Sequence, residues 1–144
     1  MIATFDRNGI RFQYPTNWSL DFEDGDAGWT AVVQSRDLAF VLVSLRADAD
    51  APAMLADEAL AALQEEYKEL DDEIFVGSFN GLPAIGHDIN FLTVDTAIAC
   101  HTRAVESPAG PLLVMTQCSD LDREKNGIVL AAILKSFQFA EEET

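Results

Sequence analysis

Basic residues are scarce in this sequence. Nine lysines and arginines stand against 25 aspartates and glutamates, which gives a formal net charge of −16. A protein that binds nucleic acid needs a cationic footprint for the phosphates, so this balance argues against nucleic acid as a partner. It also argues against attraction to an anionic membrane surface. The acidic excess favours solubility or, more specifically, attraction to a basic partner.

Long apolar runs and targeting signals are missing as well. The apolar run at residues 38–43 has the length of a strand, whereas a membrane span needs about 18 apolar residues. Residues 1–7 do not combine a basic region with an apolar one, as a secretory leader would. We therefore expect no membrane span and a cytoplasmic location.

Cysteines and catalytic motifs are few. Cys100 and Cys118 are too few and too far apart for a disulfide framework or a metal site, and both are expected to be buried thiols. The sequence has no glycine-rich phosphate loop, no Gly-x-Ser-x-Gly and no Cys-x-x-Cys. Asp24 and Asp26 share a polar loop that lacks the twelve-residue calcium pattern. We expect no cofactor, no metal and no enzymatic activity.

The N-terminal segment contains the clearest local signal. Asn-Gly at positions 8 and 9 lies between alternating apolar residues, which is the strongest short hairpin signal. This turn predicts that Phe5 lies opposite Phe12 and Ala3 opposite Tyr14. Pro15 lacks a backbone donor and is expected to end the pairing.

The remaining pattern predicts two helices among several strands. Residues 51–70 form the clearest helix, with Ala56, Leu60, Leu63, Tyr67 and Leu70 as its buried stripe. A second helix is expected to run to about Lys135, with Ser119 as its N-cap. Strands are expected over residues 18–22, 29–35, 38–45, 73–79, 84–93, 96–105 and 111–118, the last four as an antiparallel meander.

These elements predict an α+β fold in one domain over residues 1–140, followed by an acidic tail over 141–144. Several strands are apolar on both sides, as in a sheet that is covered on both faces. We therefore expect an antiparallel sheet of about six or more strands, flanked by helices on both faces.

Three short segments, together with the order of elements, give a family resemblance. They are residues 12–18, 80–84 and 133–137, which read Phe-Gln-Tyr-Pro-Thr-Asn-Trp, Asn-Gly-Leu-Pro-Ala and Ile-Leu-Lys-Ser-Phe. The sequence resembles the PsbP-like superfamily, which includes the extrinsic photosystem II subunit, a Ran-binding relative and bacterial DcrB-type proteins. The resemblance implies an α/β/α sandwich and a binding role without catalysis. One bacterial branch looks like adaptor chaperones that hold apolar helices of type VI secretion effectors.

His101 and Asp88 are the first candidates for a site. A turn at residues 94–95 places His101 opposite Asp88, on the face away from Ile98 and Cys100. A carboxylate beside an imidazole orients a general base or a metal ligand. The same pair also fits a cross-strand polar contact worth under about 1 kcal/mol.

Trp29 is the third candidate, because it follows a loop and tryptophan anchors pockets and interfaces. Trp18 is expected to fill the core beside Pro15. His87 shares a face with apolar residues and is expected to be a hydrogen-bonded core histidine. Since His87 and His101 differ in strand parity, they are not expected to converge on one metal.

The sequence favours a non-enzymatic binding or adaptor protein that engages a basic or apolar protein partner, with a secretion-effector chaperone as one form. The alternative is a small-ligand carrier or weak enzyme with a pocket between sheet and helix near His101. A third hypothesis is a self-associating structural module. The residues expected to bind are Trp29, His101 and Asp88.

Overall fold

The computed structural model describes residues 1–140, and the predicted acidic tail over 141–144 lies outside the described residues. The first half of the chain forms β1 (Ile2–Arg7), β2 (Ile10–Pro15), β3 (Ser19–Asp24), β4 (Gly28–Gln34), β5 (Phe40–Arg46) and α1 (Pro52–Glu66). The second half forms β6 (Leu70–Phe79), β7 (Leu82–Leu92), β8 (Ala97–Ser107), β9 (Gly110–Ser119), α2 (Arg123–Lys135) and β10 (Gln138–Phe139).

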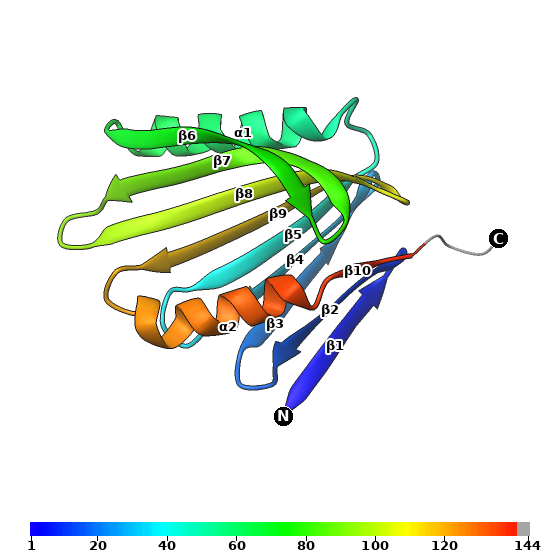
Figure 1. Cartoon of the computed structure of the whole chain (residues 1–144), viewed down its shortest axis with the longest axis horizontal. Coiled ribbons are helices and arrows are strands. Elements are labelled where there is room, and N and C mark those ends of the chain that lie inside the picture. Colours follow the sequence, from blue (N-terminus) through cyan, green and yellow to red (C-terminus); the bar gives the residue numbers. More distant parts are fainter. Residues whose placement is uncertain (141–144) are drawn as a thin grey trace.

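The strands form two antiparallel sheets. Seven strands lie in the order β3-β4-β5-β9-β8-β7-β6, and β1, β2 and β10 form a smaller sheet. α1 packs across β7, β8 and β9 on one face of the large sheet, whereas α2 and the small sheet cover the other face (Figure 1). The predicted α+β class, the meander and the helices on both faces are confirmed. The sequence did not predict the separate small sheet, because its third strand, β10, comes from the far end of the chain.

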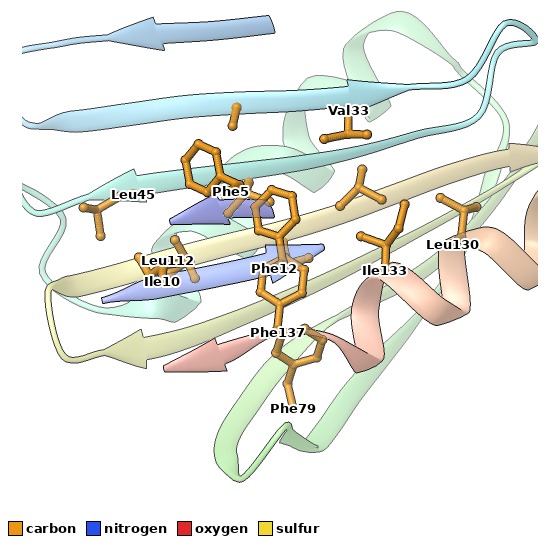
Figure 2. Close-up of a cluster of buried hydrophobic side chains, with 14 of the residues drawn as sticks. Phe5, Ile10, Phe12, Val33, Leu45, Phe79, Leu112, Leu130, Ile133 and Phe137 are labelled. Atoms are coloured by element: carbon orange, nitrogen blue, oxygen red, sulfur yellow. The ribbon is translucent and has the colours of Figure 1, made fainter. Parts of the chain in front are cut away.

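The N-terminal hairpin has the predicted register. Phe5 pairs with Phe12 and Ala3 with Tyr14, around a turn in which Asn8 and Gly9 both have positive φ. The ring of Phe12 stacks on Phe5 at 4.9 Å and on Phe137 at 4.7 Å. Figure 2 shows Phe5, Phe12, Phe137 and Phe79 as a column of rings inside the main core. The hairpin is therefore held to the sheet by aromatic packing.

The first helix is shorter than predicted. α1 ends at Glu66, and Tyr67 is already extended, whereas the sequence predicted a helix to residue 70. Leu70 instead begins β6 and pairs with Phe91, so pairing with the long strand β7 prevails over helical periodicity. The rest of the predicted stripe packs on the sheet, and Tyr67 stacks on Phe91 at 4.1 Å.

The second helix begins later than predicted. Its N-cap residue is Asp122 rather than Ser119, so the predicted cap is wrong. The Asp122 carboxylate accepts hydrogen bonds from the Ser119 backbone N–H and hydroxyl, both at 3.0 Å, which holds the turn that precedes the helix. The buried Asn126 side chain donates to Asp37 at 2.9 Å and to Asp122 at 3.2 Å. These bonds explain an Asn-Gly pair inside a helix: Asn126 ties α2 to the β4–β5 turn.

The β6–β7 turn is fastened to the end of α2. Asn80 has a positive φ of 48°, and its side-chain NH₂ donates to the carbonyl oxygens of Leu134 at 2.8 Å and Phe137 at 2.9 Å. Carbonyl groups at the end of a helix lack helical partners, so Asn80 acts as a cap supplied from another part of the chain.

Replacing Asn80 with alanine is expected to lower the free energy of unfolding by about 2 kcal/mol, through two lost hydrogen bonds and a left-handed alanine. Urea denaturation measures this change. Asn80→Gly serves as the control, because glycine tolerates the backbone angle and loses only the hydrogen bonds. If Asn80→Ala unfolds at the urea concentration of the unmodified chain, the cap contributes nothing.

Candidate binding groove

A groove lies between α2 and the middle of the large sheet. Odd-numbered residues of β8 and even-numbered residues of β7 and β9 point to this side of the sheet. The cavity has a volume of about 430 Å³. Its lining comprises Asn90, Ala99, His101, Thr116 and Cys118 from the strands and Arg123, Gly127, Leu130, Ala131 and Leu134 from α2. One wall is therefore mainly apolar, and the sheet supplies polar groups.

The groove continues toward the start of β6. A second cavity of about 590 Å³ shares Asn90 and Arg123 with the first. It is further lined by Lys68, Glu69, Leu70, Asp71, Phe91, Leu92, Ala97 and Ile98. The side chain of Leu92 is exposed here. The two cavities therefore adjoin each other at Asn90 and Arg123.

Asp88 and His101 lie on the same face of the sheet, on adjacent strands. They pair in register, as predicted, and His101 Nδ1 lies 2.7 Å from Asp88 Oδ1. Arg103 Nη1 approaches the same oxygen at 2.9 Å. Burial raises the pKa of Asp88, but hydrogen bonds from His101 and Arg103 outweigh it, so that the pKa lies below its usual value. Since Nδ1 is held by Asp88, Nε2 is the His101 nitrogen available to a bound molecule.

Arg103 is fixed by an aromatic contact across a glycine. Its guanidinium lies over the Phe75 ring at 3.6 Å from the centroid. Gly86 stands between these residues on β7 and pairs with both of them. Because Gly86 has no side chain, Phe75 and Arg103 can meet above it. The sequence carries no spacing signal for this contact, which joins three strands.

The thiol that lines the groove is a poor nucleophile. Burial, reinforced by a hydrogen bond from Cys118 Sγ to Asp122 at 3.0 Å, raises the pKa of the Cys118 thiol to about 12. Burial likewise raises the pKa of Cys100 to about 12. Both thiols are free, as predicted. A thiolate is the reactive form of cysteine, so neither thiol is activated for attack at neutral pH.

Trp29 lies away from this groove, in the core next to the N-terminal hairpin. It is 4% exposed, its ring lies 5.0 Å from that of Phe5, and its indole N–H donates to Asn8 at 2.8 Å. The structure thus brings Asp88 and His101 together but does not bring Trp29 to them. Trp29's role in binding stays a prediction, and Trp18 is a core residue as expected.

His87 lies on the opposite face of the sheet, beneath α1. It is buried, and its Nδ1 lies 2.9 Å from Asp72 Oδ1. Its Nε2 lies 3.5 Å from Asp57 of α1. The prediction of a hydrogen-bonded core histidine that does not meet His101 is confirmed. Within residues 1–140, no group of three or more histidine, cysteine or acidic side chains is placed to hold a metal ion.

No helix within residues 1–140 has the length and apolar character required to cross a membrane. No family model matches the sequence, and no curated protein matches it.

Solved structures nevertheless share the fold. The chain matches CyanoP, the cyanobacterial PsbP of Synechocystis, with a TM-score of 0.59 and 11% identity, over 96% of this chain and 92% of the other. It matches LpqN of Mycobacterium tuberculosis, a protein involved in cell envelope biogenesis, with a TM-score of 0.57 and 14% identity over 97% and 91% of the two chains.

A third match is PA94 of Pseudomonas aeruginosa, described as a protein of unknown function and a putative regulator. Its TM-score is 0.54 at 13% identity, over 99% of each chain. At these identities the matches concern the fold alone. Their nearly complete coverage agrees with the element order, the antiparallel sheet and the helices described above. The chain therefore has the PsbP-like fold.

Proposed function

We propose that this protein is a non-enzymatic adaptor that holds a segment of another protein in the groove between α2 and the strands β7 and β8. The observation that carries the proposal is the form of this groove, which adjoins a second cavity at Asn90 and Arg123 and is lined on one wall by Leu130, Ala131 and Leu134. Its floor offers polar groups from Asn90 and His101. A mainly apolar wall with a few polar groups fits a bound segment better than a bound ion.

The chemistry of the groove supports a binding role. The Cys118 thiol stays protonated. Thr116 pairs in register with His101 on the next strand, yet these two described side chains form no hydrogen bond with each other. Since an activated hydroxyl needs a base within hydrogen-bonding distance, the Thr116 hydroxyl is not activated by His101. The resemblance to adaptor chaperones makes a cytoplasmic chaperone of a secretion effector the specific form of the proposal.

A small-ligand carrier is the second candidate, and one observation favours it. Asp88, His101 and Thr116 occupy opposed positions on three adjacent strands. A ligand hydroxyl or amide between His101 and Thr116 would complete this row with a hydrogen bond at each side. Such a ligand would remain bound through purification and would be found by mass spectrometry of the denatured protein.

Filling the groove tests the adaptor proposal. Ala131 is an exposed residue of the groove wall, and Ala131→Trp would occupy the space of the bound segment. The protein is purified from its native host with its stoichiometric partner, and the affinity for that partner is then measured. We expect Ala131→Trp to weaken binding by about tenfold or more, since a hot-spot contact contributes at least 2 kcal/mol.

Ile128→Trp is the matched control, because Ile128 is an exposed residue of the same helix that does not line the groove. It is expected to bind the partner as the unmodified chain does. Equal binding by both variants would place the partner elsewhere. Recovery of a small molecule without a protein partner would favour the carrier.

A further inference from the structure

The last strand of the large sheet, β6, has an outer edge with which no other strand of residues 1–140 pairs. It is the terminal strand in the sheet order, and it is ten residues long. Every second residue of such a strand directs its backbone N–H and C=O away from the sheet. Proteins protect long edges with proline, charged side chains (lysine above all) or bulges. β6 contains neither proline nor lysine, and its charged residues, Asp71, Asp72 and Glu73, all lie among its first four residues. Its side chains Ile74 and Val76 are 71% and 76% exposed.

The opposite edge of the same sheet, β3, is shorter and touches the N-terminal hairpin. β3 is six residues long. Its residue Phe22 lies 6.1 Å from the ring of Phe5 and beneath the guanidinium of Arg7 at 4.8 Å. Arg7 also forms an ion pair with Asp24 at the end of this strand. The N-terminal hairpin therefore contacts β3 at Phe22 and Asp24, although all six residues of β3 are exposed, and β6 is the longer of the two edge strands.

The two sides of β6 have different chemistry. Val76 pairs with Ile85, and Ile74 pairs with His87, so that the two exposed apolar side chains lie on the α1 side of the sheet. α1 packs across β7, β8 and β9, so that Ile74 and Val76 lie on the same side of the sheet as α1 but nearer to its edge. On the groove side β6 instead presents the exposed carboxylates Asp71 and Glu73.

We propose that β6 is a second interaction surface, which accepts an extended segment of a partner protein as an eighth strand of the large sheet. The fitting segment alternates apolar and basic residues. Its apolar side chains lie beside Ile74 and Val76, and its lysines or arginines lie beside Asp71 and Glu73. Cross-strand pairs of both kinds stabilise a sheet, and a slip by one residue exchanges the two faces.

Charge selects a basic partner over a second copy of this chain. Each copy carries a formal charge of −16, so that two copies repel each other, whereas a basic strand is attracted. Addition of a strand to an open edge is an established mode of peptide recognition, in which the backbone supplies affinity and alternate side chains supply specificity. This surface adjoins the second cavity of the groove at Asp71, but Ile74 and Val76 line neither cavity, and the proposal does not depend on the occupant of the groove.

A synthetic peptide tests the proposal. The probe is an acetylated and amidated peptide of eight residues, in which valine and lysine alternate. We expect it to bind the full chain and to slow hydrogen exchange of backbone amides within residues 70–79. Two control peptides have the same length. One has glutamate in place of lysine, and the other groups its four valines before its four lysines. Both are expected to bind at least about tenfold more weakly, the equivalent of two lost cross-strand pairs.

Two substitutions locate the site. Val76→Lys places a charge beside the apolar side of the peptide and is expected to weaken binding about tenfold, whereas Leu20→Lys on the β3 edge leaves binding unchanged. Thermal unfolding confirms that both variants fold. The exchange measurement on the unmodified chain provides a readout that needs no variant.

Several results would overturn the proposal. Absence of binding, equal binding of the glutamate peptide, or protection outside residues 70–79 would each do so. Self-association of the chain that Val76→Lys abolishes would assign the edge to a second copy and would also contradict it. Ala131→Trp is expected to leave peptide binding unchanged, so that failure here and failure of the groove proposal remain distinguishable.

Discussion

Replacement of Phe12 by alanine is expected to lower the free energy of unfolding by about 3 to 5 kcal/mol, the range for a buried phenylalanine. Phe12 is fully buried, and its ring stacks on Phe5 from the paired strand and on Phe137 from the C-terminal segment. The substitution leaves a cavity where three segments from opposite ends of the chain meet. Urea denaturation, followed by circular dichroism, measures the change.

Phe12→Leu provides the control for this prediction. Leucine keeps most of the apolar volume but loses the ring stacking, and we expect a loss of about 1 kcal/mol. A loss below about 1 kcal/mol for Phe12→Ala would mean that the N-terminal hairpin contributes little to the stability of the domain.

The second large effect is expected at Gly86, in the interior of β7. A methyl group built on Gly86 would overlap the carbonyl oxygen of Thr102 on β8 and would lie 2.6 Å from the carbonyl carbon. Relief of this overlap requires β7 and β8 to separate. We expect Gly86→Ala to lower the free energy of unfolding by about 3 kcal/mol. It should also disturb the Arg103–Phe75 contact.

Gly127→Ala is the matched substitution with the opposite expected sign. Gly127 lies inside α2, where an added methyl group would meet its nearest atom, Arg123 Cγ, at 3.6 Å. Alanine favours a helix over glycine by about 1 kcal/mol, so this variant should be slightly more stable. The measurement compares the urea concentrations at which Gly86→Ala and Gly127→Ala are half unfolded. If both changes have the same sign and size, the close approach at Gly86 is not a constraint on the sheet.

Local turn chemistry made much of the fold predictable. Asn8 and Gly9 adopt positive φ, and this turn sets the whole register of the first hairpin. The same holds for Asn80 and Gly81 between β6 and β7. Short turns between apolar strands then leave an antiparallel meander as the simplest arrangement. These signals lie within a few residues of the structure that they determine.

Contacts between distant segments were not predictable. β10 consists of two residues, and it pairs with β2 from the other end of the chain. Asn80 caps α2 across more than fifty positions. Asn126 has a low helix propensity, and its hydrogen bond to Asp37 joins α2 to a distant turn. In each case a polar or short segment is stabilised by tertiary contacts, which outweigh local propensity.

The candidate site was predictable in part for the same reason. Asp88 and His101 meet because one short turn joins their strands. Arg103 and Phe75 belong to strands that are not adjacent, and their contact depends on the small size of the glycine between them. The apolar wall of the groove comes from α2, whose packing against β9 and β2 has no local signal. Trp29 was singled out by residue type, and its burial follows from packing against the hairpin.

The comparison of Ala131→Trp with Ile128→Trp tests the central claim most directly, because both substitutions add the same side chain to the same helix. The measured quantity is the affinity for the partner that copurifies from the native host. If the groove holds a partner segment, the Ala131 variant loses about tenfold or more in affinity, and the Ile128 variant retains it. Full affinity in the Ala131 variant would contradict the claim that the groove between α2 and the sheet is the binding site.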